Sequence, residues 1–92
     1  MESITKDKAK EIILNNRSKI FSVLFTKKDG TKRKMNARLD VKKDIKGVGL
    51  KYKPEEFNYI IAYDMIKKAY RTININTLEQ LTLNKKEYHI KN

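Results

Sequence analysis

The strongest constraint on the fold is a run of alternating residues that is interrupted by an Asp-Gly pair. In Phe21–Thr26 the aromatic and aliphatic side chains of one face occupy every second position, which is typical of a strand with one buried face. The following Lys28-Asp29-Gly30-Thr31 carries the Asp-Gly signal for a tight hairpin. In the return segment, residues 31–39, apolar and polar positions alternate again, with Met35, Ala37 and Leu39 opposite Lys32, Lys34, Asn36 and Arg38. A hairpin with a core face and a basic face is therefore predicted.

A second hairpin is predicted further along the chain. Residues 59–63 and 69–75 have strand patterns, and residues 64–68 lie between them as an unusually apolar turn. A single helical turn fits residues 76–80, with Asn76 as its cap, and two short strands around Leu81–Leu83 and Tyr88–Ile90 flank a turn at residues 84–86. The pattern places four aromatic side chains in the core: Phe21, Phe25, Tyr59 and Tyr63.

The N-terminal segment has the spacing of a short amphipathic helix. Apolar residues within residues 3–16 lie on one side among lysines, Ser3 or Thr5 can cap the helix, and the polar cluster at residues 15–18 ends it. Residues 40–58 have no periodicity, carry five lysines and predict a long basic loop, and a structureless loop of this length usually has a function.

These elements predict one mostly β domain over residues 1–92, with an N-terminal α-helix in residues 1–18 and a small five- to six-stranded SH3-like barrel in residues 19–92. A closed, strongly bent barrel suits short strands better than an open sheet does, because closure hides the strand edges.

Several short motifs resemble small bacteriophage-encoded SH3-like β-barrel proteins. The motifs are the hairpin segments 25–31 and 35–39, the Lys46-Gly47-Val48-Gly49 run, and the segments 63–65 and 70–75. The resemblance covers roughly residues 20 to 90, implies a barrel and a phage or prophage origin, and implies no defined activity.

Length and composition limit the class of protein. The 92 residues allow one modest core, and the absence of cysteine leaves that core, with no disulfide or thiolate metal site, to hold the fold. The N-terminus has no signal-peptide pattern, and the longest apolar runs are far too short to span a bilayer. We therefore expect a protein of the cytoplasm, in a bacterial host cell, without a membrane partner.

Positive charge is the feature that points to a partner. The chain has 22 Lys and Arg against 11 Asp and Glu, a net charge of +11. Between residues 27 and 53 there are 11 basic and three acidic residues, so eight of these net charges are concentrated there. Such a field attracts polyanions. The alternative interpretation is a solvated strand face in a lysine-rich protein.

The predicted contact residues follow from this concentration of charge and from nearby aromatic residues that could stack on bases. Arg71 shares a strand face with Ile73 and Ile75, which places it either at the rim of the barrel or in a site. With only four arginines against 18 lysines, contact with a backbone or a protein surface is favoured over base-specific recognition. The predicted nucleic-acid or partner-binding residues are Lys27, Lys28, Lys32, Arg33, Lys34, Arg38, Lys42, Lys43, Lys46, Lys51, Tyr52, Lys53, Tyr70 and Arg71.

No catalytic or metal-binding constellation is recognisable. His89 is the only histidine and is predicted on the polar side of the last strand, where it is an exposed bystander. Asp40, Asp44, Glu55 and Glu56 lack ligand spacing, and no phosphate-binding glycine motif is present. We expect no catalytic residue, no metal and no cofactor. Metal-independent RNA cleavage is the one enzymatic alternative.

The sequence therefore predicts a non-enzymatic binding protein whose partner is RNA, DNA or a host nucleoprotein such as a CRISPR effector nuclease. Its most specific form, an inhibitor of a host RNA-guided nuclease (an anti-CRISPR protein), rests on what the phage resemblance implies. The alternative is a structural or assembly protein of a phage particle or replication complex that docks by protein-protein contact. The oligomeric state is left open.

Overall fold

The computed structural model describes residues 2–39 and 58–91, and this part of the chain is mostly β with one α-helix, as predicted. The elements in chain order are β1 (Glu2–Thr5), α1 (Lys6–Leu14), β2 (Phe21–Thr26), β3 (Lys32–Arg38), β4 (Tyr59–Asp64), β5 (Ala69–Asn74), the 3₁₀-helix η2 (Ile75–Thr77), β6 (Leu78–Leu83) and β7 (Lys86–Lys91).

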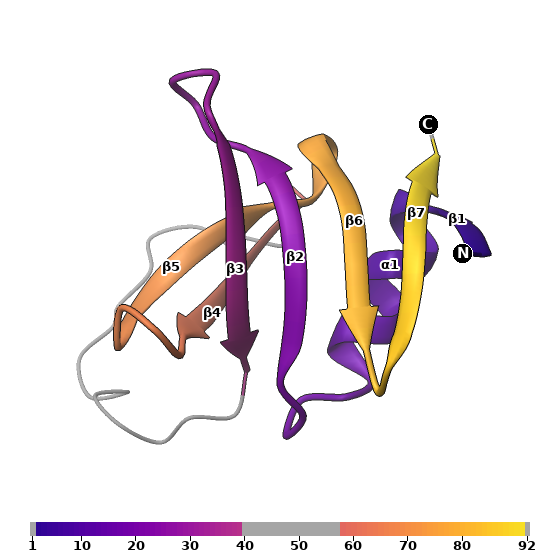
Figure 1. The fold of residues 1–92 in the computed structure, drawn as a ribbon, viewed down its shortest axis with the longest axis horizontal. Coiled ribbons are helices and arrows are strands. Elements are labelled where there is room, and N and C mark those ends of the chain that lie inside the picture. Colours follow the sequence, from indigo (N-terminus) through magenta and orange to yellow (C-terminus); the bar gives the residue numbers. More distant parts are fainter. Residues whose placement is uncertain (1, 40–57, 92) are drawn as a thin grey trace.

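The seven strands form one sheet in the order β1-β7-β6-β2-β3-β4-β5. All pairs are antiparallel except β1 with β7, which is parallel. The sheet is strongly bent, so that β4 and β5 cross β2 and β3 at a steep angle (Figure 1). Among the described strands no pairing joins β5 to β1. The prediction of a closed barrel with five or six strands is therefore wrong in strand number and in closure.

The N-terminal segment is shorter in helix than predicted and contributes to the sheet. Residues 2–5 form β1, which pairs with β7 from Glu2 opposite Tyr88 to Thr5 opposite Lys91, so Ser3 is a strand residue and no cap. Thr5 is the N-cap of α1, and its Oγ1 accepts a hydrogen bond of 3.1 Å from the Lys8 backbone N–H. β1 has only four residues, which is too few to show a clear alternation of apolar and polar positions. The helical pattern that follows therefore dominates the prediction for this segment.

The helix packs on the core through one face. Ala9 and Ile13, four residues apart, have no exposed surface and belong to the same apolar cluster as the strands. In Figure 1 α1 lies behind β6 and β7. The cluster runs from one end of the described chain to the other, and its members are Ile4, Ala9, Ile13, Phe21, Val23, Phe25, Met35, Ala37, Leu39, Ile60, Ala62, Ile73, Ile75, Leu78, Leu81, Leu83 and Ile90.

The β2–β3 hairpin is confirmed, with a five-residue connection rather than a two-residue turn. Thr26 pairs with Lys32, and the Lys27 backbone N–H donates to the Thr31 carbonyl at 2.8 Å. Gly30 has φ +87°, a left-handed conformation that other residues adopt only with strain. Asp29 Oδ1 accepts hydrogen bonds from the backbone N–H of Thr31 at 3.0 Å and from its hydroxyl at 2.6 Å. The Asp29 side chain therefore stabilises the turn through hydrogen bonds to another residue of the same turn.

The β4–β5 hairpin is also confirmed, but the buried face of β4 is the opposite of the predicted one. Ile60, Ala62 and Asp64 are buried, whereas Tyr59 and Tyr63 are half-buried on the opposite face. The prediction that these two tyrosines lie in the core is therefore wrong. Asp64 is the only buried charged residue in the described chain. Its hydrogen bonds explain why this face of β4 is the buried one.

Asp64 occupies a core-facing position of β4, where an apolar residue is usual, because its side chain stabilises the next turn. Its Oδ1 accepts hydrogen bonds from the backbone N–H groups of Ile66 at 2.9 Å and Lys67 at 3.0 Å. A buried carboxylate that satisfies two turn amides holds the β4–β5 connection in one conformation.

The helical turn before β6 lies one residue earlier than predicted. It is η2, with Asn74 rather than Asn76 as its cap, and residues 78–80 already belong to β6. The Thr77 hydroxyl accepts from the Thr26 backbone N–H at 3.2 Å and donates to the Thr26 carbonyl at 2.7 Å. This clamp lies next to the register shift between Leu24 and Phe25 in the pairing of β2 with β6. It fixes the end of β2 from which the hairpin turn begins.

Candidate basic pocket

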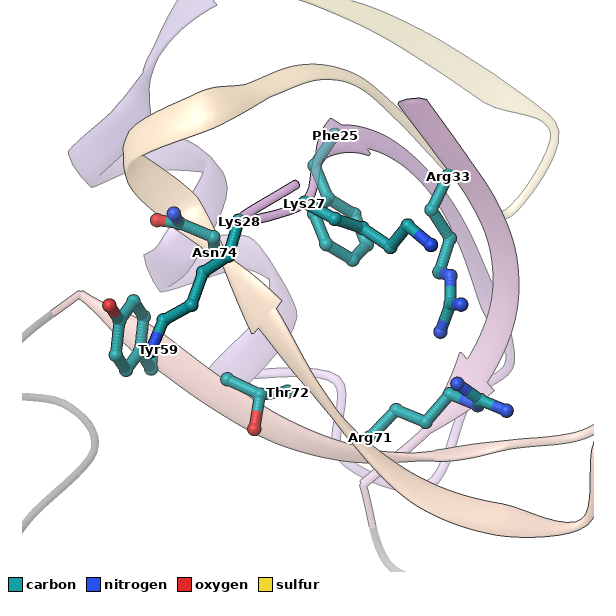
Figure 2. A pocket seen from close by; sticks show the side chains of 8 residues that line it. All are labelled: Phe25, Lys27, Lys28, Arg33, Tyr59, Arg71, Thr72 and Asn74. Atoms are coloured by element: carbon teal, nitrogen blue, oxygen red, sulfur yellow. The ribbon is translucent and has the colours of Figure 1, made fainter. Parts of the chain in front are cut away.

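A pocket of about 440 Å³ lies between the β2–β3 hairpin and the edge strand β5. Its walls come from segments that are far apart in the sequence. They are the end of β2, the hairpin turn, the start of β3, the start of β4 and the C-terminal part of β5. The residues that line it are Phe25, Lys27, Lys28, Arg33, Tyr59, Arg71, Thr72 and Asn74 (Figure 2).

Arg33 reaches the pocket because it lies on the core-facing side of β3. It is two residues before buried Met35 and is paired across the hairpin with Phe25. Phe25 is 3 % exposed and belongs to the core, so its ring supplies an apolar surface to the pocket while it packs inward. Figure 2 shows the Arg33 guanidinium turned toward that of Arg71, which enters from the opposite wall.

Arg71 is held in place by the buried carboxylate of β4. It lies on the same face of β5 as buried Ile73, and its Nε is 3.5 Å from Asp64 Oδ2. This Nε is inaccessible to solvent and makes no hydrogen bond. The attraction of the carboxylate therefore orients the guanidinium, whose terminal nitrogens extend into the pocket (Figure 2). The structure thus places Arg71 in the lining of the pocket.

Lys27 and Lys28 come from the hairpin turn. Lys27 Nζ is 3.7 Å from Asp29 Oδ2, an exposed ion pair that contributes little to stability. Hydrogen bonds from the Thr31 hydroxyl and backbone N–H lower the pKa of Asp29, and the nearby charge of Lys27 lowers it further. Within the described residues neither Lys28 nor Arg33 has an ion-pair partner. The pocket keeps a surplus of positive charge.

The third wall is polar and aromatic. Tyr59 begins β4 and pairs with Asn74 of β5, so both side chains project from the outer face of the β4–β5 hairpin. Asn74 Oδ1 accepts a hydrogen bond of 3.0 Å from the Asn76 backbone N–H. In Figure 2 Lys28 extends toward the Tyr59 ring, with Thr72 between this end and the arginines. The pocket therefore has an arginine end and a tyrosine end.

Of the predicted contact residues, the structure brings four together in the pocket and separates four others from it. Lys32, Lys34 and Arg38 lie on the opposite, outer face of β3. Lys32 Nζ is paired with Glu79 Oε1 at 2.8 Å. Tyr70 is on the outer face of β5 and packs edge-to-face against Tyr63, with ring centroids 5.2 Å apart. The described members of the predicted basic patch therefore lie on two surfaces, on opposite sides of the sheet.

The remaining predicted contacts fall outside the described residues. The predicted basic loop, residues 40–58, lies there except for Asn58, which has φ 56° and precedes β4. The predicted contact residues that lie outside the described residues are Lys42, Lys43, Lys46, Lys51, Tyr52 and Lys53.

Sequence reasoning missed the members of the pocket that carry no charge, and it missed Asp64. The prediction that Phe25 lies in the core is confirmed, and its position in the pocket lining depends on which chain segments face it. For Arg33 a signal was available, because the alternation of β3 places it on the side of Met35, Ala37 and Leu39. A cation on the core side of a strand, next to the turn of a hairpin, indicates a pocket or a rim.

Other kinds of site receive no support within the described residues. No group of three or more His, Cys, Asp or Glu residues there could hold a metal ion. His89 is exposed and pairs across the sheet with Gln80. None of the helices in residues 2–39 and 58–91 combines the length and apolar character needed to cross a bilayer.

Comparison with protein families matches residues 9–79 to the model named WYL_2, described as an Sm-like SH3 β-barrel fold. The protein belongs to this family. The match includes every residue that lines the pocket, whereas β1 and β7 lie outside it. Comparison with curated proteins and with solved structures finds no significant match. The SH3-like part of the predicted fold is thereby confirmed.

Proposed function

We propose that the protein binds nucleic acid, alone or within a nucleoprotein, and acts by binding rather than by catalysis. The observation that carries the proposal is the pocket, where Lys27, Lys28, Arg33 and Arg71 line one recess together with Tyr59. Cations supply attraction to phosphates, and aromatic surface supplies contact with bases. The net charge of +11 adds a long-range field that steers a polyanion toward the protein.

The most specific form of the proposal is an inhibitor of a host RNA-guided nuclease, an anti-CRISPR protein that acts in the cytoplasm of a bacterial cell. It is supported by the resemblance to small phage barrel proteins, and by a site suited to the nucleic acid that such a nuclease carries. A panel of purified RNA-guided nucleases, each with excess protein, tests this form. Unchanged cleavage of target DNA across the panel would contradict it while leaving nucleic-acid binding intact.

The general proposal is tested by fluorescence anisotropy with labelled single-stranded and duplex oligonucleotides of DNA and RNA. Binding should weaken steeply between 50 and 200 mM salt, by about tenfold or more, because counterions are released when phosphates are neutralised. The alternative, docking onto a phage component through apolar surface, predicts binding to protein that persists or strengthens at high salt. Absence of oligonucleotide binding at 50 mM salt would contradict the proposal.

A matched pair of variants separates local contact from general charge. Lys27→Gln with Lys28→Gln removes two charges at the hairpin turn. Lys19→Gln with Lys85→Gln removes one charge from the segment before β2 and one from the β6–β7 turn. These segments lie at the end of the sheet opposite the β2–β3 turn (Figure 1). We expect a loss of affinity of about tenfold for the first pair and less than about threefold for the second, since phosphate contacts are short-ranged. Equal losses would mean that the pocket has no special role.

A further inference from the structure

Strand β5 lies at one edge of the sheet, and among the described strands only β4 pairs with it. The pairing covers all six residues of β5 without a register shift. β5 contains no proline and no bulge, two of the devices that keep edge strands from pairing with other chains. β1, at the other edge, has only four residues and leads directly into α1. β5 is therefore the edge better suited to accept a further strand.

The register shows which backbone groups of β5 point toward β4. The Ile75 backbone N–H donates to the Asn58 carbonyl at 2.8 Å, which makes these two residues a hydrogen-bonded pair. Hydrogen-bonded pairs alternate along an antiparallel ladder, so Ile73 and Arg71 also direct their N–H and carbonyl groups toward β4. The residues between them direct these groups to the open edge.

Three backbone groups are thereby placed at the open edge of β5. Thr72, which is exposed, directs both its N–H and its carbonyl there, and Asn74 directs its N–H there. The Asn74 carbonyl accepts a hydrogen bond of 3.3 Å from the Thr77 hydroxyl. A strand lying beside β5 would find two donors and one acceptor in the spacing of a sheet ladder.

The open edge of β5 is also one wall of the basic pocket, because Thr72 and Asn74 line it. The lining includes four cations and no acidic residue. Figure 2 shows the guanidinium groups of Arg33 and Arg71 turned toward each other in the space beside this strand. A chain segment that pairs with β5 would therefore have one of its faces against positive charge.

We propose that β5 accepts an extended acidic segment of a partner protein as an additional strand. Main-chain hydrogen bonds to the open edge give such strand addition its affinity, and alternate side chains give it specificity. Every second side chain of the added strand would lie on the face of Arg71, toward Arg33, where a carboxylate can form bidentate hydrogen bonds with a guanidinium. The intervening side chains would lie beside Thr72 and need no charge. The structure thus assigns a sequence pattern, acidic at every second residue.

This inference goes beyond the proposed function, because pairing along β5 needs no nucleic acid. The added strand would occupy the same pocket, whose volume is about 440 Å³. An acidic segment of this pattern therefore competes with an oligonucleotide for the site. Such competition would let a partner protein release the nucleic acid.

A second copy of the chain is the other candidate for this edge. Antiparallel pairing of β5 with itself would place both copies of Arg71 on one face of the joined sheet, each with its own Arg33 nearby. Like charges so placed oppose pairing, whereas an acidic segment brings the opposite charge. Sedimentation equilibrium at the concentration of the binding assay checks this point. A mass of two chains would overturn the inference.

The test uses two labelled eight-residue peptides, each with four threonines and four glutamates, in fluorescence anisotropy at 50 mM salt. In one peptide the two residue types alternate, and in the other the four glutamates come first. Both have the same charge, so a difference in affinity reports the alternation that a strand requires. We expect the alternating peptide to bind at least about tenfold more tightly, as for one hydrogen bond to a charged group. Equal affinity would overturn the inference.

Two N-methylated forms of the alternating peptide test backbone pairing. One form is methylated on the threonine nitrogens and the other on the glutamate nitrogens. Successive N–H groups of a strand point to opposite edges, so only one of these sets can face β5. We expect one form to lose about tenfold or more in affinity and the other to keep it. The form that loses affinity identifies antiparallel or parallel addition, and equal effects of the two would overturn the inference.

A matched pair of variants tests the protein side. Thr72→Pro removes an N–H from the open edge, a place where edge strands tolerate proline because that group does not bond the neighbouring strand. Thr72→Val keeps the N–H. We expect Thr72→Pro to weaken binding of the alternating peptide by about fivefold or more and Thr72→Val by less than about twofold. Circular dichroism checks folding, and an unchanged affinity in folded Thr72→Pro would overturn the inference.

Failure of this inference and failure of the proposed function have different results. If the protein binds oligonucleotides and does not distinguish the two peptides, only the inference fails. If it prefers the alternating peptide and binds no oligonucleotide at 50 mM salt, only the proposed function fails. The peptide comparisons use the unmodified protein, so their outcome does not depend on whether a variant folds.

Discussion

Both faces of β3 carry positive charge, but the surroundings of that charge differ. Arg33 points into a recess, across from Arg71 and beside the Phe25 ring. Lys32 and Lys34, its neighbours in sequence, are exposed on the outer face, where Lys32 pairs with Glu79. In sequence these residues form one basic run. In the structure they become one concave site and one flat, solvated face, so the surroundings of a charge, rather than the number of charges, distinguish a binding site.

The first prediction concerns the stability that each face of the hairpin contributes. Phe25→Ala removes a ring from the core, and we expect a loss of about 3–5 kcal/mol in the free energy of unfolding. Leu24→Ala, on the half-buried outer face of the same strand, should cost much less, about 1 kcal/mol. Urea denaturation measures both. Similar losses for the two variants would mean that the pocket side is no better packed than the outer side.

The second prediction compares the two carboxylates that pair with cations on the two faces. Asp64 is buried and bonds two turn amides besides pairing with Arg71, so Asp64→Ala should lower the free energy of unfolding by about 2–3 kcal/mol. Glu79→Ala breaks the Lys32 pair, in which the side chains are 62 % and 37 % exposed, and should cost less than about 1 kcal/mol. A larger effect at Glu79 would reverse the comparison of the two faces.

The third prediction concerns the dependence of affinity on salt. For single strands the slope of log K against log salt concentration falls by about 0.7 for each phosphate that is neutralised. If Arg33 and Arg71 hold one phosphate between them, replacing both with Gln should reduce the magnitude of the slope by about 0.7. Two independent contacts would reduce it by about 1.4. Anisotropy titrations at several salt concentrations separate these cases, and an unchanged slope would place the phosphates elsewhere.

The smallest expected effect is a dependence of the hairpin on pH. The hydrogen bonds from Thr31 lower the pKa of Asp29 in the folded state, with a further contribution from Lys27. Asp29 therefore stabilises the turn above its unfolded-state pKa, and this contribution is lost as the pH falls through its lower folded-state pKa. NMR titration of the Asp29 carboxyl carbon measures the shift, and Thr31→Val, which removes the hydroxyl donor, should raise the pKa toward its ordinary value. An unaltered pKa in Thr31→Val would contradict this account of the turn.

Much of the fold followed from local patterns in the sequence. The β2–β3 hairpin was predictable because alternation and the Asp-Gly pair agree, and Gly30 does adopt the left-handed conformation. The last hairpin followed from a polar turn, in which Asn84 and Lys85 both have positive φ. These elements need no information from distant parts of the chain.

The elements whose prediction was wrong depend on contacts between distant segments. β1 has only four residues, and it is a strand because β7 supplies its partner. The face of β4 was reversed because Asp64, polar in sequence, is buried where it bonds the next turn. Tyr59 is large and partly apolar, so the alternation of the sequence places it in the core, whereas it is half-buried on the opposite face. A period-two pattern defines two faces and does not say which one is buried when each carries apolar residues.

For the site, the sequence supplied the charges but not their grouping. Lys27, Lys28, Arg33 and Arg71 were all predicted contacts, yet Arg71 is 38 residues beyond Arg33 in the chain and meets it only because the sheet bends. The uncharged lining of the pocket carries no signal in the sequence, since Phe25, Thr72 and Asn74 also satisfy ordinary strand positions.

The most direct test of the account is an NMR titration of the isotopically labelled protein with a thymidine 10-mer, following the backbone amides and the arginine Nε–H groups. The account predicts that the largest shifts occur at the pocket, above all at Arg33, Arg71 and the Lys27–Lys28 turn, while Lys32 and Lys34 on the outer face of β3 change little. Shifts that are largest on the outer face, with the two arginine side chains unaffected, would contradict it.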